Sequence, residues 1–439
     1  MKIGILPSND KTNGWNCILP ARTPHAALDG DTNADWLVIG AGFAGLAAAR
    51  RLAENRPEER IVLIDAGICG ENASGRNSGF AIDTPHTAAG GDEKELLNAQ
   101  AYSRVSRAGI AYHQEQIDRY GFDCDWDVAG KYQTAVTDRG KAEMLDPFAV
   151  TLDKLGEPYE WIGHEELAAR IGTPHFKHAI YTPGCVLLNP AALVRGLADN
   201  MPDNVTLREE TPVTAIEYRN GIQATTSGGT IRAPRMILAA NGFSDQFGFM
   251  QRKFVHIAAH ASITRPLTDA EIEAYGVTEP WGVTPINALG SITCRFTRDR
   301  RILVRNQMDI ATSRSTTQAR QDAMSLQHKR LFDEWWPMLP DVEMEHTWTG
   351  YVAVSRNGAP AFGQIASNVW ISACQNAVGV AKGTASGMLV ADLACGRDNP
   401  LIEDMVSLGQ PADTPPAWMT DIGARVRLRW DTWKTRHEA

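Results

Sequence analysis

Six consecutive residues, Gly40-Ala41-Gly42-Phe43-Ala44-Gly45, have the glycine spacing of a loop that binds a pyrophosphate. In such a loop Gly40 permits a tight turn, Gly42 lets the backbone approach a phosphate, and Gly45 lets a helix pack closely on a strand. The N–H groups at the start of that helix face the anion, which the helix dipole also attracts. The spacing therefore predicts a dinucleotide site that includes Gly40, Gly42, Phe43, Ala44 and Gly45.

An acidic residue, Asp65, follows the loop at the end of the next apolar run, Ile61 to Ile64. A carboxylate in this position accepts hydrogen bonds from the ribose 2′-hydroxyl of a dinucleotide. It would repel the 2′-phosphate of NADP, so that cofactor is disfavoured. We include the adjoining Ala66 in the predicted site. The alternative is a glycine-rich turn in an unrelated α/β protein, which the strand–loop–helix context disfavours.

A second candidate segment, Ala73-Ser74-Gly75-Arg76-Asn77-Ser78-Gly79, follows shortly after. It combines small residues, hydrogen-bond donors and one fixed cation. That composition suits a long, doubly phosphorylated cofactor lying extended across the protein, with Arg76 and Asn77 at its pyrophosphate or flavin. An exposed loop is the alternative. The predicted cofactor contacts here are Ser74, Gly75, Arg76, Asn77, Ser78 and Gly79.

The elements that must position these segments follow two patterns. Short apolar runs at Trp36 to Ile39 and Ile61 to Ile64 are typical of buried parallel strands, with a helix between them. Similar runs occur at 236–240 and 369–373, and the second leads into a helix that ends near residue 394. Residues 254–310 instead alternate between apolar and polar types, which predicts an antiparallel sheet.

We therefore predict a mixed α/β fold, in which a Rossmann-type cofactor-binding domain is interleaved with a largely antiparallel β-sheet substrate domain. The cofactor-binding domain is expected to comprise 1–95, 185–245 and 346–439, and the substrate domain 96–184 and 246–345. Residues 1–34 show no sustained period and are expected to form an irregular arm on a domain surface.

Composition excludes several other classes. The net charge of −9 argues against nucleic-acid binding, and the seven cysteines include no Cys-x-x-Cys pair that would suggest a zinc site or a dithiol centre. Free thiols suit a reducing cytosol, so a cytoplasmic location is expected. The apolar run Ile3 to Leu6 is too short for a signal peptide and no apolar run approaches 18 residues, so neither a signal peptide nor a transmembrane helix is expected. For the C-terminal basic cluster an amphipathic helix with a solvated face is favoured over a nucleic-acid or membrane patch; its members are Arg425, Arg427, Arg429, Lys434 and Arg436.

Further segments add a resemblance to a known family. They are Ala73 to Gly79, Pro183-Gly184-Cys185-Val186 with Asn189-Pro190, Leu238-Ala239-Ala240-Asn241-Gly242, and Trp348-Thr349-Gly350-Tyr351 with Asn357, Pro360 and Gly363. With these residues the chain resembles the FAD-dependent D-amino-acid oxidase and glycine oxidase superfamily, and within it the amine-oxidising branch that includes gamma-glutamylputrescine oxidase. The matches extend over most of the chain.

The resemblance implies an extended FAD whose flavin lies at the interface with the substrate domain. Val213 would flank the adenine. Ala240, Asn241 and Gly242 would lie near the pyrophosphate and ribose. Gly350 belongs to the C-terminal signature of the family. The flavin edge would be met at a helix N-terminus, which stabilises the negative charge of reduced flavin. The residues expected there are Gly379, Val380, Ala381, Lys382, Gly383 and Thr384.

Two departures from the family pattern affect these expectations. Ala377 and Val378 stand where the branch has a glycine and a polar residue, so one face of the flavin is expected to be walled differently. The segment Ser355-Arg356-Asn357-Gly358 is basic where the family has an acid. Arg76-Asn77 occupies the region in which covalent variants carry a His, so non-covalent FAD is expected, with Cys374 as the alternative attachment point.

The chemistry implied is oxidation of the C–N bond of an amine or amino acid, by hydride transfer to flavin N5, with hydrolysis of the imine product. The candidate substrate-site residues are Tyr351, His260, Arg305 and Lys382. Tyr351 could cover the flavin or pack in the core, and Arg305 could bind a carboxylate or end a solvated strand. His260 and His256 would share one face of a strand, with a core or surface histidine as the alternative. Lys382 could balance reduced-flavin charge.

Three functions remain open at this stage. The first is an oxidase that uses O2, and the second is a dehydrogenase that passes electrons to a quinone or a protein. The third is a non-catalytic flavin- or nucleotide-binding sensor. No metal site is expected, because the sequence contains no ligand spacing that would form one.

Overall fold

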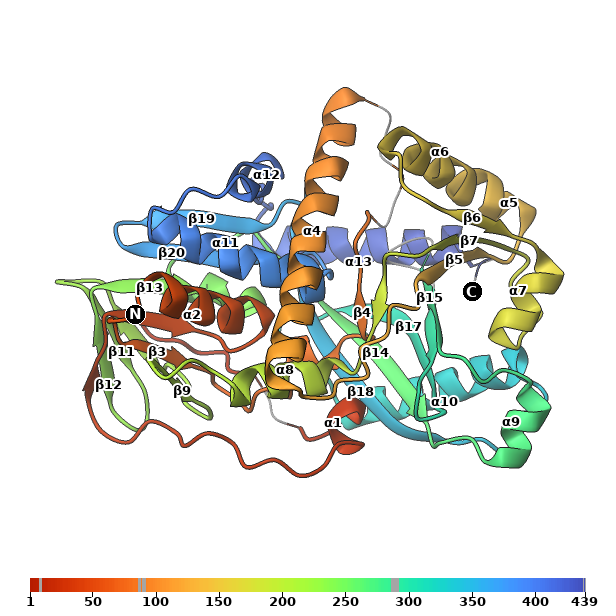
Figure 1. Ribbon diagram of the computed structural model, residues 1–439, viewed down its shortest axis with the longest axis horizontal. Coiled ribbons are helices and arrows are strands. Elements are labelled where there is room, and N and C mark those ends of the chain that lie inside the picture. The colour runs from red at the N-terminus through yellow and green to blue at the C-terminus, as the bar shows by residue number, and fades with distance from the viewer. Residues whose placement is uncertain (8–9, 86–87, 89–91, 286–291, 437, 439) are drawn as a thin grey trace.

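The fold is described from a computed structural model, which covers residues 1–7, 10–85, 88, 92–285, 292–436 and 438 (Figure 1). Three sheets of four or more strands organise the chain, and a small two-stranded sheet joins β4 (Phe80–Ala81) to β8 (Val186–Leu187). Within the described ranges, no helix combines the length and apolar character needed to cross a bilayer.

A six-stranded sheet with the order β19-β20-β13-β2-β3-β9 forms the first layer. All of its pairs are parallel except β19 with β20. Side chains alternate between its two faces: Val38 and Leu63 point toward the helices, while Leu37 and Val62 point toward a smaller sheet. The strands are β2 (Trp36–Ile39), β3 (Ile61–Ile64), β9 (Val205–Arg208), β13 (Arg235–Leu238), β19 (Ala361–Ala366) and β20 (Val369–Ala373).

Helices and a small sheet cover the two faces of this layer. Helices α2 (Phe43–Asn55) and α11 (Thr384–Ala394) lie side by side on one face (Figure 1). They approach closely because residue 387 is glycine: a Cβ there would stand 2.1 Å from Ala44 O. The opposite face packs on a four-stranded sheet of β1 (Thr32–Asn33), β12 (Thr230–Ala233), β11 (Ile222–Thr225) and β10 (Ala215–Glu217).

An eight-stranded sheet with the order β18-β14-β17-β16-β15-β5-β7-β6 forms the other half of the molecule. It is antiparallel except for the pair β15 and β5, as the alternation of residues 254–310 predicted. Its strands are β5 (Lys131–Ala135), β6 (Glu160–Ile162), β7 (His178–Thr182), β14 (Val255–Thr264), β15 (Trp281–Thr284), β16 (Thr293–Phe296), β17 (Ile302–Ile310) and β18 (Met344–Val354).

Helix α10 (Gln318–Trp335) closes one face of this sheet with an aromatic core that includes Phe332, Trp335 and Trp336. The long helix α4 (Glu93–Tyr120) runs across the middle of the molecule (Figure 1). Its caps are regular, since Asp92 accepts from Glu95 N and Gly121 ends the helix with φ +66°.

The remaining elements connect these layers. They are α1 (Gly14–Cys17), α3 (Ala73–Arg76), α5 (Asp138–Gly140), η1 (Lys141–Leu145), α6 (Asp146–Leu155), α7 (His164–Ile171), α8 (Pro190–Asp199), η2 (Asn241–Phe247), α9 (Asp269–Tyr275), η3 (Gly379–Gly383), α12 (Leu401–Ser407) and α13 (Ala417–Lys434).

The mixed α/β class is confirmed, with a Rossmann-type sheet beside a largely antiparallel one. The boundaries of the two predicted domains stay a prediction. One strand bears on them directly: all but the first two residues of β18 fall in the range 346–439, which was predicted to bind cofactor, yet the strand pairs with β14 in the eight-stranded sheet. The chain therefore crosses between the two layers within that range.

Candidate cofactor and substrate site

A cavity of about 370 Å³ lies between the ends of β2, β3 and β13 and the inner face of the eight-stranded sheet. Most of the predicted site residues line it. Those on its wall are Gly40, Gly42, Phe43, Ala44, Asp65, Ala66, Ser74, Arg76, Asn77, Ser78, Val213, Ala240, Asn241, Gly242, Arg305, Gly350, Tyr351, Gly379, Val380, Ala381 and Gly383. Gly45, Gly75, Gly79, His260, Lys382 and Thr384 lie behind the wall.

The glycine loop has the geometry that its spacing predicted. Gly40 has φ +104°, and a Cβ on Gly45 would stand 1.7 Å from Gly40 O, so neither position tolerates a side chain. Helix α2 begins at Phe43 with no side-chain cap, because its N-cap residue is Gly42. The Phe43 N–H donates to Ser74 Oγ at 3.1 Å. The first turn of α2 therefore presents backbone N–H groups to the cavity, as an anion site requires.

Asp65 has a structural role beside its predicted contact with ribose. Its Oδ2 accepts from Ala41 N at 2.7 Å and its Oδ1 accepts from Gly67 N at 2.8 Å. Burial raises the pKa of the Asp65 carboxyl, and these two N–H groups oppose that rise. Since each oxygen keeps a second lone pair, the carboxylate can hold the loop and still accept from a ligand.

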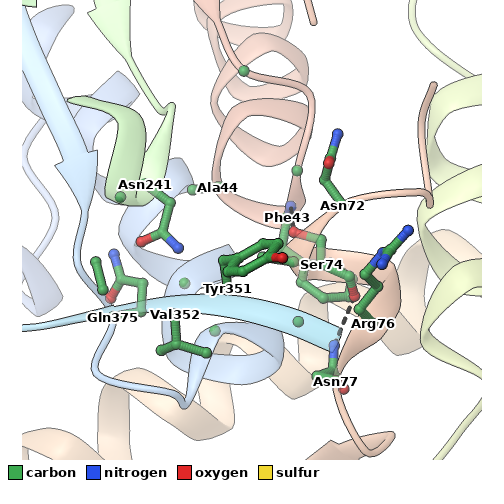
Figure 2. Close-up of a pocket in the computed structure, with 18 of the residues that line it drawn as sticks. Phe43, Ala44, Asn72, Ser74, Arg76, Asn77, Asn241, Tyr351, Val352 and Gln375 are labelled. Atoms are coloured by element: carbon green, nitrogen blue, oxygen red, sulfur yellow. Dashed lines mark hydrogen bonds between the residues drawn. The ribbon is translucent and has the colours of Figure 1, made fainter. Parts of the chain in front are cut away.

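Arg76 is buried, and the exposed loop considered as its alternative is wrong. Its guanidinium forms an ion pair with Asp10 and donates to Thr349 O at 2.9 Å and Glu71 O at 2.5 Å. These contacts join the N-terminal arm and β18 to α3. The charge of Arg76 is therefore matched by protein, although its side chain still lines the cavity beside Asn77 (Figure 2).

The N-terminal arm is largely exposed, as predicted for an arm on a domain surface, and it also contributes to the site. Ile3 and Ile5 line the cavity. The backbone of the arm donates two hydrogen bonds that hold it there, from Ile3 N to Thr214 O at 2.9 Å and from Ile5 N to the side-chain oxygen Gln246 Oε1 at 2.7 Å. The sequence did not predict this contact with the site, because so short a paired segment has too little sequence to show a period.

The substrate side of the cavity holds two of the predicted residues, Tyr351 and Arg305. Figure 2 shows the Tyr351 ring between Asn241 and Asn77, and its hydroxyl donates to Thr316 Oγ1 at 3.0 Å. The Arg305 guanidinium donates to Thr293 Oγ1 at 2.9 Å and has no carboxylate within 4.0 Å among the described residues. Burial lowers the pKa of Arg305 to about 10, so it stays charged at neutral pH.

His260 lies in the core behind this wall. It contacts Thr349 Oγ1 through Nδ1 at 3.0 Å and Asp309 Oδ2 through Nε2 at 2.9 Å. His256 lines the cavity and His260 does not, so the expectation that both histidines face the site fails at His260. The pairing irregularity next to His260 belongs to β17, where Gln307 is the extra residue, and β14 pairs with β18 without a break from Val255 to Ile263.

Sequence reasoning missed a cluster around His256. Its Nε2 lies 3.1 Å from Asp245 Oδ2 and 2.8 Å from Arg314 Nη2, and Arg314 also pairs with Asp245. The Arg314 guanidinium stands 5.1 Å from the centre of the Phe243 ring. Burial lowers the pKa of Arg314 despite its partner. The three polar residues come from η2, β14 and the segment after β17, so no local spacing in the sequence marks them.

The flavin-edge segment has an unusual backbone. Cys374, Asn376 and Ala377 have φ values of 53°, 54° and 68°, which favour glycine. Ala377 therefore has the left-handed backbone conformation that favours glycine, at the position where the related branch has a glycine. The segment leads into η3, and burial there lowers the pKa of Lys382 to about 8. The Lys382 ammonium points away from the cavity, 5.2 Å from the centre of the Tyr102 ring.

Cys374 is shielded from the cavity. Its Sγ lies 3.7 Å from Ala353 O, and burial raises the pKa of the thiol to about 12. A buried, protonated thiol is a poor nucleophile, which supports the expectation of non-covalent FAD. All seven cysteines are free thiols. Within the described ranges, no group of three His, Cys, Asp or Glu side chains is placed to hold a metal ion.

Comparison with known proteins decides the family. A model of the family described as FAD dependent oxidoreductase (DAO) matches residues 35–393. This chain belongs to that family. It is an FAD-dependent oxidoreductase, as the resemblance implied, and it is 24% identical over 379 residues to a probable oxidoreductase OrdL of Haemophilus influenzae, covering 84% of each chain.

Other relatives agree with this assignment. The chain is 24% identical over 390 residues to the gamma-glutamylputrescine oxidoreductase of Escherichia coli, covering 85% of this chain and 86% of the relative. The fold matches the crystal structure of glycine oxidase from Geobacillus kaustophilus with a TM-score of 0.71 and 19% identity, covering 84% of this chain and 96% of that one. At this identity the likeness establishes the fold only.

The residues present fit FAD. The start of α2 has no side-chain cap, and a Cβ on Gly42 would stand 2.5 Å from Ser74 Oγ, where a phosphate-binding loop needs its backbone open. Asp65 on the wall retains acceptor capacity for a ribose. The loop, Asp65 and the segment from Ser74 to Ser78 would hold the nucleotide half, and η3 would face the flavin.

Proposed function

We propose that this protein oxidises the C–N bond of an amine that carries a carboxylate, such as an amino acid or an N-substituted amino acid. The observation that carries the proposal is Arg305, a half-buried and charged guanidinium on the cavity wall whose charge no described carboxylate matches within 4.0 Å. Once a bound ligand covers such a cation, the loss of water is costly unless the ligand supplies the counter-charge. A substrate carboxylate supplies it, in the bidentate geometry that guanidinium favours.

The arrangement of the wall supports a defined orientation for such a substrate. Thr293 holds the Arg305 guanidinium from the neighbouring strand, so the carboxylate would be fixed at β17. Tyr351 and Gly350 on β18 form the wall nearer the glycine loop. The amine carbon would lie between these two strands. Bound FAD, held non-covalently, supplies the two-electron acceptor for the C–H bond next to nitrogen, and the imine product hydrolyses.

The amine must lose its proton before that bond is oxidised. His256 lines the cavity from β14, the strand between β17 and β18, and it contacts both Asp245 and Arg314. We assign proton transfer to it within this proposal.

Anaerobic absorbance titrations test the proposal with matched ligand pairs. Glycine and N-methylglycine are compared with methylamine and dimethylamine, which lack the carboxylate. The carboxylate-bearing member of the pair that reacts should bleach the oxidised-flavin spectrum. Arg305→Met should then raise the half-saturating concentration roughly 100-fold, because it removes a buried charge pair, while Arg305→Lys should restore part of that loss.

Other outcomes of the titration would contradict parts of the proposal. Equal bleaching by amines without a carboxylate would overturn the role of Arg305 but would still support oxidation of an amine. If no amine of a broader panel bleaches the flavin, the alternative of a non-catalytic flavin-binding sensor is favoured. Readmitting air separates an oxidase, which regains its spectrum, from a dehydrogenase, which regains it only with a quinone or protein acceptor. A cytoplasmic location belongs to the same proposal, since all seven cysteines are free.

A further inference from the structure

The last helix, α13, turns its polar side toward the protein. It packs against β17 and β14, and Thr312 Oγ1 donates to Asp421 Oδ1 at 3.0 Å. Asp431 is buried, and its neighbours on the same side are buried or half-buried. Residues three or four apart share a helix face, so these positions form one inward stripe. Its members are Thr420, Asp421, Ala424, Leu428, Asp431 and Thr435.

The outward face of α13 carries large apolar side chains, which reverses the usual polarity of a surface helix. Their spacing of three and four residues places them in one stripe along the helix. Each remains about half exposed or more: Trp418 67%, Met419 46%, Ile422 57%, Val426 63%, Trp430 57% and Trp433 55%. We call this set the apolar stripe. Such a contiguous patch marks a surface that is covered by something else.

Basic side chains border the apolar stripe on both sides. At about 100° per residue, Arg425 and Arg429 lie along one edge, and Arg427 and Lys434 lie along the other. Arg425 pairs with Asp421 and Arg427 pairs with Asp431. Both aspartates belong to the inward stripe, so their carboxylates lie on the side of the helix that faces the protein. Arg429 and Lys434 have no carboxylate within 4.0 Å among the described residues.

We propose that α13 docks this enzyme on the surface of an anionic lipid bilayer. A helix lying in the membrane interface buries an apolar stripe containing Trp among the acyl chains, and its flanking Arg and Lys reach the headgroups. Tryptophan is favoured at that depth. The arrangement of α13 meets each requirement, and its acids face the protein, away from the lipid phosphates.

The charge distribution selects a membrane over a second copy of the chain. Two α13 helices packed stripe to stripe would bring their basic borders together, which costs free energy through like-charge repulsion. An anionic bilayer instead complements both borders. The chain as a whole carries −9, so the rest of the surface is repelled by such a bilayer. Binding should therefore depend on α13 and weaken with salt.

Flotation of the FAD-loaded protein with vesicles tests the proposal. Vesicles of phosphatidylcholine with phosphatidylglycerol should bind the protein, and vesicles of phosphatidylcholine alone should bind it far less. Arg429→Gln with Lys434→Gln should weaken binding roughly 30-fold, since each basic residue near an anionic surface contributes about 1 kcal/mol. Ile422→Ser with Trp430→Ser should abolish it.

A matched control uses an exposed apolar residue elsewhere. Leu326 on α10 is 64% exposed, and Leu326→Ser should leave vesicle binding unchanged. The flavin spectrum and melting temperature of every variant report whether it is folded. Equal binding to both kinds of vesicle, or to neither, overturns the proposal. So does a dimer in light scattering that Ile422→Ser with Trp430→Ser converts to a monomer, since a second copy would then cover the stripe.

Discussion

At the scale of single residues, two positions in the site are energetically unfavourable: one carries an unpaired charge, and the other has a backbone conformation that favours glycine. Arg305 is a cation with no described counter-charge, and Ala377 is a non-glycine residue held at φ 68°. Both lie on the cavity wall. Strain and unpaired charge of this kind persist only where the surrounding structure enforces them, and they cluster at functional sites.

Ala377→Gly is expected to stabilise the protein. The left-handed conformation costs a non-glycine residue about 1–2 kcal/mol, and the extra freedom of glycine in the unfolded chain returns about 0.5–1 kcal/mol of that. The free energy of unfolding in urea should therefore rise by about 0.5–1 kcal/mol. Ala169→Gly in α7 is the control, because a regular helix there should lose about 1 kcal/mol. A loss at both positions would show that Ala377 is not strained.

At the scale of elements, the flavin-edge segment depends on α4. A Cβ on Gly109 would stand 2.0 Å from Ala381 O, so α4 and η3 are in direct contact. His113 on α4 reinforces this contact: its Nε2 lies 3.0 Å from Val380 O and 2.8 Å from Thr384 Oγ1. The contacts with α4 therefore fix the position of η3 relative to the cavity.

This contact predicts a pH dependence. Burial lowers the pKa of His113 from 6.5 to about 4. Below about pH 6.5 the unfolded chain binds a proton at His113, while the folded protein resists protonation until about pH 4. The free energy of unfolding therefore decreases as the pH is lowered from about 6.5 to about 4. His113→Gln keeps a donor for Val380 O and cannot titrate. Chemical denaturation should show the variant losing less stability than the wild type between pH 6.5 and 4, by up to about 3 kcal/mol.

His328 and His175 have similarly lowered pKa values of about 4, so they contribute equally to both proteins and cancel in the difference. Parallel pH profiles for the wild type and His113→Gln would mean that His113 is protonated in the folded state, and that the contact between α4 and η3 does not depend on its neutral form.

At the scale of the whole molecule, the cavity is bounded by two sheets with separate cores. The loop after β2 provides one wall and the eight-stranded sheet provides the other. Protein contacts also link the two walls, among them Arg76, which ties α3 to β18 through Thr349 O. A ligand that fills the cavity therefore holds both halves together.

Removal of FAD should lower the stability of both halves at once. Acid precipitation of the native protein should release the flavin into the supernatant, because the attachment is expected to be non-covalent. Adding FAD back at 100 times its dissociation constant should raise the free energy of unfolding by about 2.7 kcal/mol, and NAD should not. Flavin retained in the pellet would reveal covalent attachment, and a melting temperature unaffected by FAD would contradict the linking role.

The sequence by itself determined the family, the cofactor and the parts of the site that depend on local spacing. The loop from Gly40 to Gly45, with Asp65 after it, is readable because a turn and the strand and helix around it are formed by neighbouring residues. The alternation of 254–310 predicted the antiparallel sheet for the same reason. The composition of the segment around Ser74 marked it as a second cofactor contact, and the resemblance added the segment around Gly379; both reach the cavity.

Only the tertiary structure decided how distant residues combine. The packing of β14 left His256 on the cavity wall and His260 behind it, and three elements brought His256, Asp245 and Arg314 together. Packing also turned an acidic and partly polar side of α13 inward, so that the apolar stripe is exposed beside the basic cluster that was predicted to be solvated. Register, burial and facing depend on what each element packs against, and that is a property of the whole fold.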